Sequence, residues 1–158
     1  MNNRRVGTVV SWMAALALVI PAYGQEKKCS SIGGVMITNL GVVDQETTMG
    51  VAMGDLKGAV AATIQSVTPN SDGTVSFTVQ HHFVTETGDI IFFNPATAVT
   101  QPVSATRYAV LDYPVTINGG TGKYAHATGQ TNAIGAVDLG SGQTVFRYSG
   151  RLCLVSGN

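Results

Sequence analysis

Alternation of hydrophobic and polar residues recurs along most of the chain after residue 30. A period of two is typical of strands that bury one face. The clearest example runs from Thr74 to Thr85 and follows a turn, Asn70–Gly73, whose residues tolerate left-handed backbone conformations. Its two faces consist of Val75, Phe77, Val79, His81 and Phe83 on one side, and Ser76, Thr78, Gln80 and His82 on the other.

The same pattern predicts further strands, separated by glycine, asparagine and aspartate. They are expected at 35–40, 90–93, 106–117, 129–139 and 143–155, with Asn94-Pro95 ending a strand, a loop up to Pro102, and an edge, bulge or bend at Pro114. The alanines between Gln45 and Val67 would suit a helix. However, Gly50, Gly54 and Gly58 would each cost a helix interior about 1 kcal/mol, so two strands meeting around Gly54-Asp55 are predicted.

Two cysteines, Cys29 and Cys153, stand near the two ends of this series of strands. In an oxidising compartment such a pair predicts one disulfide, and a reactive thiol is the alternative. About eight strands with short connections leave a sandwich or a barrel as the choice. A bridge that joins the first and last strands favours an all-β, small closed antiparallel β-barrel.

The N-terminal segment has the composition of a signal peptide. Arg4 and Arg5 precede an apolar run of 15 residues, and Pro21–Gly24 offers the small residues of a cleavage site. The run is shorter than the roughly 20 residues that span a bilayer, so a cleaved signal peptide is favoured over an uncleaved membrane anchor. We therefore predict a signal peptide at 1–24, a barrel domain at 25–158, no stable membrane anchor after processing, and a secreted or periplasmic location.

The charge of the mature chain is small. Seven Lys and Arg residues remain beside nine Asp and Glu once Arg4 and Arg5 are removed, a net charge of −2. No basic stretch is available to neutralise phosphates, which argues against nucleic acid as a partner.

One segment resembles a known family. Asn118-Gly119-Gly120-Thr121-Gly122-Lys123-Tyr124, with Gly129 five residues on, is similar to the signature of the allene oxide cyclase and dirigent barrel superfamily. Gly88-Asp89 before Ile90–Phe92, and Gly54-Asp55-Leu56, resemble two other segments of that family, in the family's order. The glycine-rich segment lacks the GK[ST] pattern and following helix of a phosphate loop.

The resemblance implies an eight-stranded barrel with an apolar cavity, often trimeric, that works without a cofactor. Members of the family fold a flexible hydrophobic substrate into one geometry, either as cyclases or by orienting radicals made elsewhere. Much of such an effect is positioning, with electrostatic help from a few polar groups. The polar pocket residues of the family have no clear counterparts in this sequence, so the resemblance assigns no catalytic residue to this chain.

Candidate chemistry comes from the residues themselves. His81 shares an apolar face, so it is the best general acid or base if that face lines the lumen. The alternative is a hydrogen-bonded histidine at the barrel end, or one covered by another subunit. His82 points the other way, which makes the pair a poor metal site, and His126 is expected at the surface.

Asp112 alternates with Tyr108 and Val110 on one face of its strand, and the opposite face consists of Arg107, Ala109, Leu111 and Tyr113. Arg147 and Arg151 are possible partners of Asp112. Two hypotheses follow for Asp112. It belongs either to a cluster of Asp, Arg and Tyr side chains in the lumen, or to a salt bridge on the outer face that stabilises by at most about 1 kcal/mol. Tyr124 can pack its ring inward and keep its hydroxyl at a wet rim. The predicted sites are therefore His81, Asp112 and Tyr124 as catalytic candidates, and Phe77, Phe83, Phe92, Tyr108 and Arg147 as ligand-binding candidates.

No hydrolase motif is present. Three functions remain as hypotheses: a cofactor-free cyclase or isomerase acting on a small hydrophobic molecule, a barrel that binds such a molecule without turning it over, and a structural barrel with a filled interior. Phe77, Phe83, Phe92 and Tyr124 are the side chains that would fill the lumen in the third case.

Overall fold

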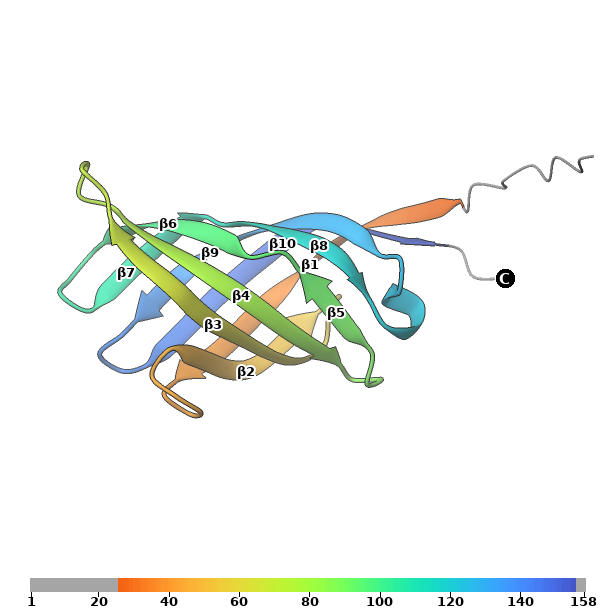
Figure 1. The fold of residues 1–158 in the computed structure, drawn as a ribbon, viewed down its shortest axis with the longest axis horizontal. Helices are drawn as coiled ribbons and strands as arrows, with labels where there is room; N and C mark the ends of the chain where they lie inside the picture. The colour runs from red at the N-terminus through yellow and green to blue at the C-terminus, as the bar shows by residue number, and fades with distance from the viewer. Residues whose placement is uncertain (1–25, 156–158) are drawn as a thin grey trace, which may run out of the picture.

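The computed structural model describes residues 26–155, and the predicted signal peptide lies outside them. The described chain is a closed antiparallel β-barrel (Figure 1). Its strands are β1 (Lys27–Leu40), β2 (Thr47–Gly54), β3 (Gly58–Pro69), β4 (Val75–Thr85), β5 (Ile90–Phe93), β6 (Ala96–Pro102), β7 (Arg107–Asp112), β8 (Pro114–Gly120), β9 (Thr128–Asp138) and β10 (Gln143–Val155), with one 3-10 turn at Gly122–Tyr124.

Ten strands fill eight positions around the barrel because two positions are each shared by two short strands. β5 and β6 both pair with β4, and β7 and β8 both pair with β9. A proline, which has no backbone N–H for a ladder, stands at each interruption: Pro95 lies between β5 and β6, and Pro114 is the first residue of β8. The predicted all-β barrel of about eight strands is confirmed.

The barrel closes where its first and last strands meet. β1 pairs with β10 from Lys27 to Asn39, and Cys29 is the direct register partner of Cys153. The two cysteines form the predicted disulfide. In Figure 1 this end of β1 and β10 extends beyond the rest of the barrel, on the side of the 3-10 turn.

The segment after Pro95 differs from its prediction. Residues 96–102 were expected to form a loop, but they form β6, which pairs with Val75–Val79 of β4. β4 is eleven residues long and β5 only four, so the first half of β4 needs a second partner. The inward residues of β6 are Ala96, Ala98 and Thr100, which are small and give a weak hydrophobic signal.

A β-bulge changes which residues of β7 face inward. Val99 pairs with Asp112 and the next residue, Thr100, with Val110, so Leu111 is an extra residue. Leu111 and Asp112 are both exposed as a result, while Val110 and Tyr113 are both buried. Strict alternation had placed Tyr113 on the face opposite Val110, and this prediction is wrong because of the inserted residue.

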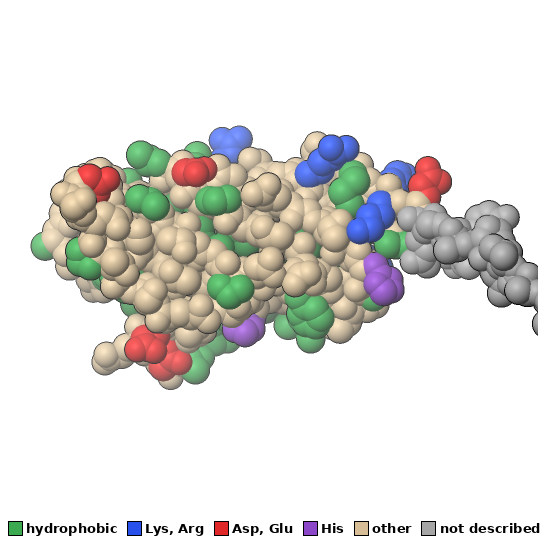
Figure 2. Space-filling model, turned by 45° about the horizontal axis from the view of Figure 1, so that its top comes forward, with side chains coloured by type: hydrophobic (Ala, Val, Ile, Leu, Met, Phe, Trp, Pro, Cys, Tyr) green, Lys and Arg blue, Asp and Glu red, His purple; other side chains and the backbone are tan. Residues whose placement is uncertain are grey.

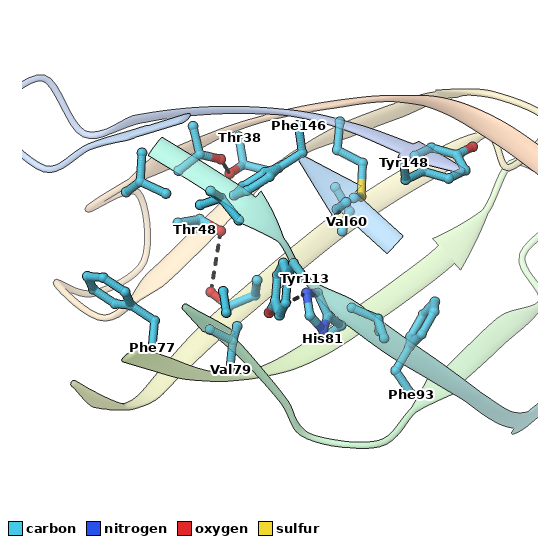
Figure 3. Close-up of a pocket in the computed structure, with 18 of the residues that line it drawn as sticks. Thr38, Thr48, Val60, Phe77, Val79, His81, Phe93, Tyr113, Phe146 and Tyr148 are labelled. Carbon is cyan, nitrogen blue, oxygen red and sulfur yellow. Dashed lines mark hydrogen bonds between the residues drawn. The ribbon is translucent and has the colours of Figure 1, made fainter. Parts of the chain in front are cut away.

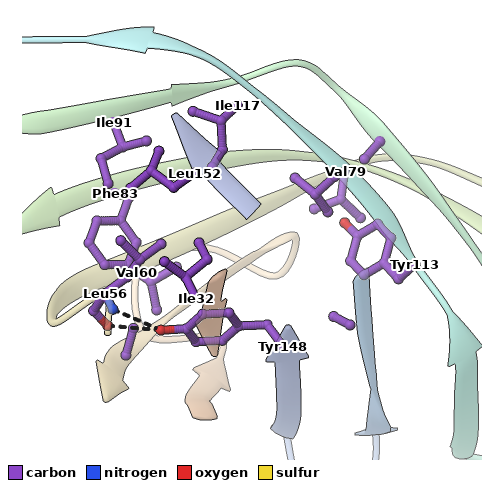
Figure 4. Packing of buried hydrophobic residues seen from close by; sticks show 14 of the residues in the cluster. Ile32, Leu56, Val60, Val79, Phe83, Ile91, Tyr113, Ile117, Tyr148 and Leu152 are labelled. Carbon is purple, nitrogen blue, oxygen red and sulfur yellow. Dashed lines mark hydrogen bonds between the residues drawn. The ribbon is translucent and has the colours of Figure 1, made fainter. Parts of the chain in front are cut away.

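One end of the barrel, which we call the closed end, is filled by packed apolar side chains. Leu56, Phe83, Ile91, Ile117 and Leu152 are all buried there, and Figure 4 shows them grouped together. Their close packing leaves the middle of the barrel as the place where a cavity can form.

Tyr148 extends this packing because its partner in β1 is a glycine. Gly34 is the register partner of Tyr148, and a Cβ there would lie 2.6 Å from the Tyr148 hydroxyl oxygen. With no side chain at Gly34, the Tyr148 hydroxyl reaches Leu56, accepting a hydrogen bond from its N–H (3.0 Å) and donating one to its carbonyl (3.2 Å). The dashed lines of Figure 4 mark both bonds.

Within residues 26–155, no helix has the length and hydropathy to cross a membrane.

Candidate functional site

A cavity of about 100 Å³ occupies the middle of the barrel. Its walls come from inward residues of nearly all the strands, most of them aliphatic or aromatic. No Asp, Glu, Lys or Arg side chain is among the described residues that line it. The lumen is therefore hollow rather than filled by side chains, and its interior is uncharged.

The main polar feature of the cavity is a pair of aromatic side chains, His81 of β4 and Tyr113 between β7 and β8. The Tyr113 hydroxyl oxygen lies 3.1 Å from His81 Nε2 (Figure 3). The two ring centroids are 5.5 Å apart, and Phe93 packs edge-on against His81 with a centroid distance of 5.8 Å. Among the described residues, the Tyr113 hydroxyl is the one polar partner of the His81 ring, and the apolar ring of Phe93 packs against the same imidazole.

Burial controls the protonation of both groups. Removal from water lowers the pKa of His81 to about 4, with a smaller contribution from the nearby His82. The same cause raises the pKa of the Tyr113 hydroxyl well above its ordinary value. At neutral pH the pair therefore consists of a neutral imidazole and a neutral phenol.

The other ring nitrogen of His81, Nδ1, is buried and has no hydrogen-bond partner among the described residues. Buried polar atoms in native proteins are almost always paired, so an orphaned one calls for an explanation. The ring that carries this nitrogen lines the cavity, where a guest molecule could supply the partner.

Threonine hydroxyls form a second polar region of the cavity wall. Thr38 and Thr144 share a hydrogen bond of 2.6 Å, and Thr100 donates to the Val75 carbonyl at 2.9 Å. Thr48 reaches the Ala62 carbonyl at 3.4 Å. Their bonds lie within the wall, so these hydroxyls are largely occupied by the protein itself.

The aromatic residues predicted to bind a ligand are placed differently from one another. Phe77 and Phe83 line the cavity. Tyr108 packs edge-on against Phe77, with ring centroids 5.4 Å apart, and is not part of the lining. Phe92 points out of the barrel and is 48% exposed, because it neighbours the inward residues Ile91 and Phe93 in β5.

The predicted lumenal cluster of Asp112, Arg147 and a tyrosine does not form. Asp112 lies outside the barrel because of the bulge, where it accepts a hydrogen bond from Asn132 Nδ2 at 2.7 Å. Arg147 is exposed on the outer face of β10. The described ion pair joins Arg107 and Asp138 instead, at 3.0 Å.

Tyr124 is buried at the closed end of the barrel, outside the cavity lining, with Lys123 Nζ 5.1 Å from the centre of its ring. The expected inward ring is present, but the residue packs rather than lining the lumen. His82 and His126 are both exposed. Among residues 26–155 no three potential metal ligands gather in one place.

The three sequence segments that carry the family resemblance meet at the closed end. Thr121 Oγ1 accepts a hydrogen bond from the Ile90 N–H at 2.8 Å, which ties the glycine-rich segment to β5. Gly122 has a φ of +51°, and a Cβ there would overlap the carboxylate of Asp89. Asp55 accepts a bond from the Gly33 N–H at 2.7 Å. These residues therefore build the barrel rather than the cavity chemistry.

The sequence did not single out the wall threonines or the pairing of Tyr113 with His81. Thr38, Thr48 and Thr144 stand at inward positions of alternating strands, and this alternation was the available signal. Tyr113 could not be found in this way, because an inserted residue shifts it to the inner face.

Comparisons with known proteins add little beyond this geometry. No family model matches the chain, and no curated protein matches it either. Two solved structures of pterocarpan synthase dirigent proteins are similar to it. GePTS1 has a TM-score of 0.38 at 15% identity, covering 86% of this chain and 90% of its own. PsPTS1 has a TM-score of 0.37 at 17% identity, covering 85% and 100%.

Proposed function

We propose that this chain is an exported barrel that binds a small hydrophobic molecule in its lumen. The observation that carries the proposal is the uncharged cavity in the middle of the barrel, lined mainly by apolar side chains with a few polar groups. Sites for small ligands usually combine these features, because apolar walls supply affinity and a few polar groups fix orientation.

The finer proposal is that the barrel controls the geometry of its guest as a cofactor-free cyclase or isomerase. A cavity that holds a flexible molecule in one conformation lowers the entropic cost of ring closure. His81 and Tyr113 form the polar centre of this proposal, since they are the paired titratable groups on the cavity wall. Positioning is the larger expected effect, and the neutral imidazole adds one polar contact.

The alternative is an extracytoplasmic binding protein that holds its guest without converting it. The same cavity supports this function, and only turnover separates the two. The third hypothesis, a barrel filled by its own side chains, is weakened by the structure. Of the four residues expected to fill the lumen, Phe92 lies outside and Tyr124 packs at one end. The other two, Phe77 and Phe83, line the cavity without filling it.

Export is supported by the disulfide between Cys29 and Cys153, since such bridges persist mainly in oxidising compartments. The signal peptide itself is a prediction from the sequence.

The test uses the full chain expressed in a secreting host and recovered in its oxidised form. Extraction and mass spectrometry are expected to find a small apolar molecule in stoichiometric amount. Incubation with polyunsaturated epoxides or aromatic radical precursors, followed by chiral chromatography, then tests conversion. Stereo-enriched product supports the cyclase, and bound molecule without product supports the binding protein.

A matched pair of variants locates the activity. His81→Ala removes the cavity histidine, whereas His82→Ala removes its exposed neighbour on the same strand. We expect loss of stereocontrol only in His81→Ala. Equal behaviour of both variants would remove His81 from the proposal.

We also propose that the partner of the outer surface is another copy of this chain. One cross-strand row of outward residues is entirely apolar and runs over seven neighbouring strands, from β9 through β10, β1, β2, β3 and β4 to β5. We call this row the outer belt; it consists of Ala136, Val145, Ile37, Val51, Ala59, Val84 and Ile90.

The large members of the outer belt are well exposed, from 38% for Ile90 to 51% for Val51. Figure 2 shows that hydrophobic side chains reach the surface along the length of the barrel. Contiguous exposed apolar residues commonly mark interaction sites, and a surface without charge can face its own copy without repulsion. The resemblance described above implies a trimer.

A further inference from the structure

The hydrogen atoms of His81 and Tyr113 can be placed by counting unpaired groups. A neutral imidazole carries one N–H and one acceptor nitrogen, and a neutral phenol must donate its hydrogen to be satisfied. The Tyr113 hydroxyl is bonded to His81 Nε2 and to no other described group. Two arrangements of the hydrogens are therefore possible.

In the first arrangement the Tyr113 O–H donates to Nε2, and the hydrogen of the imidazole is on Nδ1. This leaves a single unpaired group, the Nδ1–H. In the second arrangement Nε2–H donates to the phenol oxygen. This leaves two unpaired groups, the hydrogen of the phenol and the lone pair of Nδ1. Because each buried, unpaired polar group is costly, the first arrangement is favoured.

His81 then carries one unpaired hydrogen-bond donor, the buried Nδ1–H, and no unpaired acceptor, on a ring that lines the cavity. Figure 3 shows its ring among the cavity side chains, with only one of its two nitrogens joined to Tyr113. The ring is held in place by Phe93 on one side and Tyr113 on the other. This N–H can donate a hydrogen bond to an acceptor atom of a guest molecule, but it cannot bond to a donor.

The charge of the cavity limits the guest further. No cationic side chain lines the cavity among the described residues, so a carboxylate or phosphate would be buried without a counter-charge. No anionic side chain lines it either, so an ammonium group would meet the same penalty. Burial of an unpaired ion is far more costly than burial of a neutral polar group.

We propose that the cavity selects an uncharged, mainly apolar molecule with one acceptor oxygen, such as a carbonyl or cyclic ether, which accepts a hydrogen bond from His81 Nδ1. Tyr113 is the positioning residue, because its hydroxyl holds the hydrogen of the imidazole on Nδ1. This inference rests on the proposed binding of a hydrophobic molecule in the lumen and names the chemical class of that molecule.

The experiment compares three cyclohexane derivatives, the first two of nearly the same size, on the oxidised, full-length protein after removal of any bound molecule. Cyclohexanone carries the acceptor oxygen, methylenecyclohexane replaces that oxygen by CH₂, and cyclohexanecarboxylate carries a charge. Affinities are measured by NMR titration. We expect cyclohexanone to bind about two- to twelvefold more tightly than methylenecyclohexane, the range of one net hydrogen bond, and the carboxylate to bind most weakly.

A second readout examines the imidazole directly. Long-range ¹H–¹⁵N correlation spectra of the histidine rings distinguish a hydrogen on Nδ1 from one on Nε2. We expect the Nδ1–H form for His81, a shift of this signal on addition of cyclohexanone, and a mixture of the two forms in Tyr113→Phe. In His81→Phe the preference for the ketone should disappear while binding of methylenecyclohexane remains.

The outcomes separate the two proposals. If no probe binds, the proposed function is wrong and the inference falls with it. If the ketone and the hydrocarbon bind equally, binding in the lumen stands and the inference is overturned. An Nε2–H form of His81 in the free protein, or tightest binding of the carboxylate, also overturns the inference alone.

Discussion

The hydroxyl oxygen of Tyr113 lies 3.1 Å from Nε2 of His81, although Tyr113 stands at a position that strict strand alternation would place outside the barrel. The extra residue Leu111 in the bulge turns Tyr113 inward, and the strand break before Pro114 follows directly. The polar centre of the cavity therefore depends on an irregularity of one strand.

Removal of the Tyr113 hydroxyl should destabilise the protein. Tyr113→Phe leaves His81 Nε2 buried without a partner, and we expect the free energy of unfolding in urea to fall by about 1–3 kcal/mol. Tyr108→Phe is the matched control, because its hydroxyl makes no hydrogen bond to the described residues and its ring also packs in the barrel. Equal effects of the two variants would contradict the importance of the pair.

Acid should weaken the fold through His81. The pKa of this histidine is lowered from 6.5 to about 4 by burial, so between these pH values the unfolded chain binds a proton that the folded chain does not. The free energy of unfolding should fall as the pH decreases from 6.5 to 4, by about 3 kcal/mol, and this contribution should level off below pH 4.

Urea unfolding at intervals between pH 7 and pH 4 measures this slope. His82 on the outer side of β4 and Tyr113 are the titratable groups near His81. His81→Phe should remove most of the slope, and His126→Phe, which changes an exposed histidine, should retain it. A slope that survives in His81→Phe would assign the acid sensitivity to other groups.

The disulfide should stabilise the barrel without being needed to close it. Cys29 and Cys153 are 124 residues apart in sequence, and cross-linking a loop of this length stabilises by about 5 kcal/mol on the chain-entropy model. β1 remains paired with β10 as far as Asn39 in either case. We expect the Cys29→Ser, Cys153→Ser double variant to keep a β-sheet circular dichroism spectrum and to unfold at lower urea. An unfolded double variant without denaturant would show that strand pairing alone cannot close the barrel.

A charge in the outer belt should disrupt self-association. We expect the wild-type chain to sediment as an oligomer at micromolar concentration, and Val51→Lys to sediment as a monomer. Val99→Lys is the control, since Val99 is exposed to a similar extent (49% against 51%) but lies outside the belt, on β6. A monomeric wild type would refute the proposal.

The amino-acid sequence alone determined the strands with strong alternation, the turns between them and the pairing of the two cysteines. These features follow from local periodicity and from residues such as Gly and Asn whose backbone preferences act within a few positions. His81 could be assigned to the inner face of β4 for the same reason, because β4 has no bulge between Val75 and Phe83 on that face. The family resemblance also came from local segments, and these build the closed end.

Only the tertiary structure decided where the cavity lies and which polar groups share it. β6 carries too little hydrophobic signal to be found before its partner β4 is known, and the bulge at Leu111 is visible only in the register of β7 against β6. The hydrogen bond between His81 and Tyr113 joins residues 32 apart in the chain, so it depends on barrel closure rather than on periodicity. A single inserted residue reverses every later side chain of a strand, which is why local patterns predict strands well and lumenal clusters poorly.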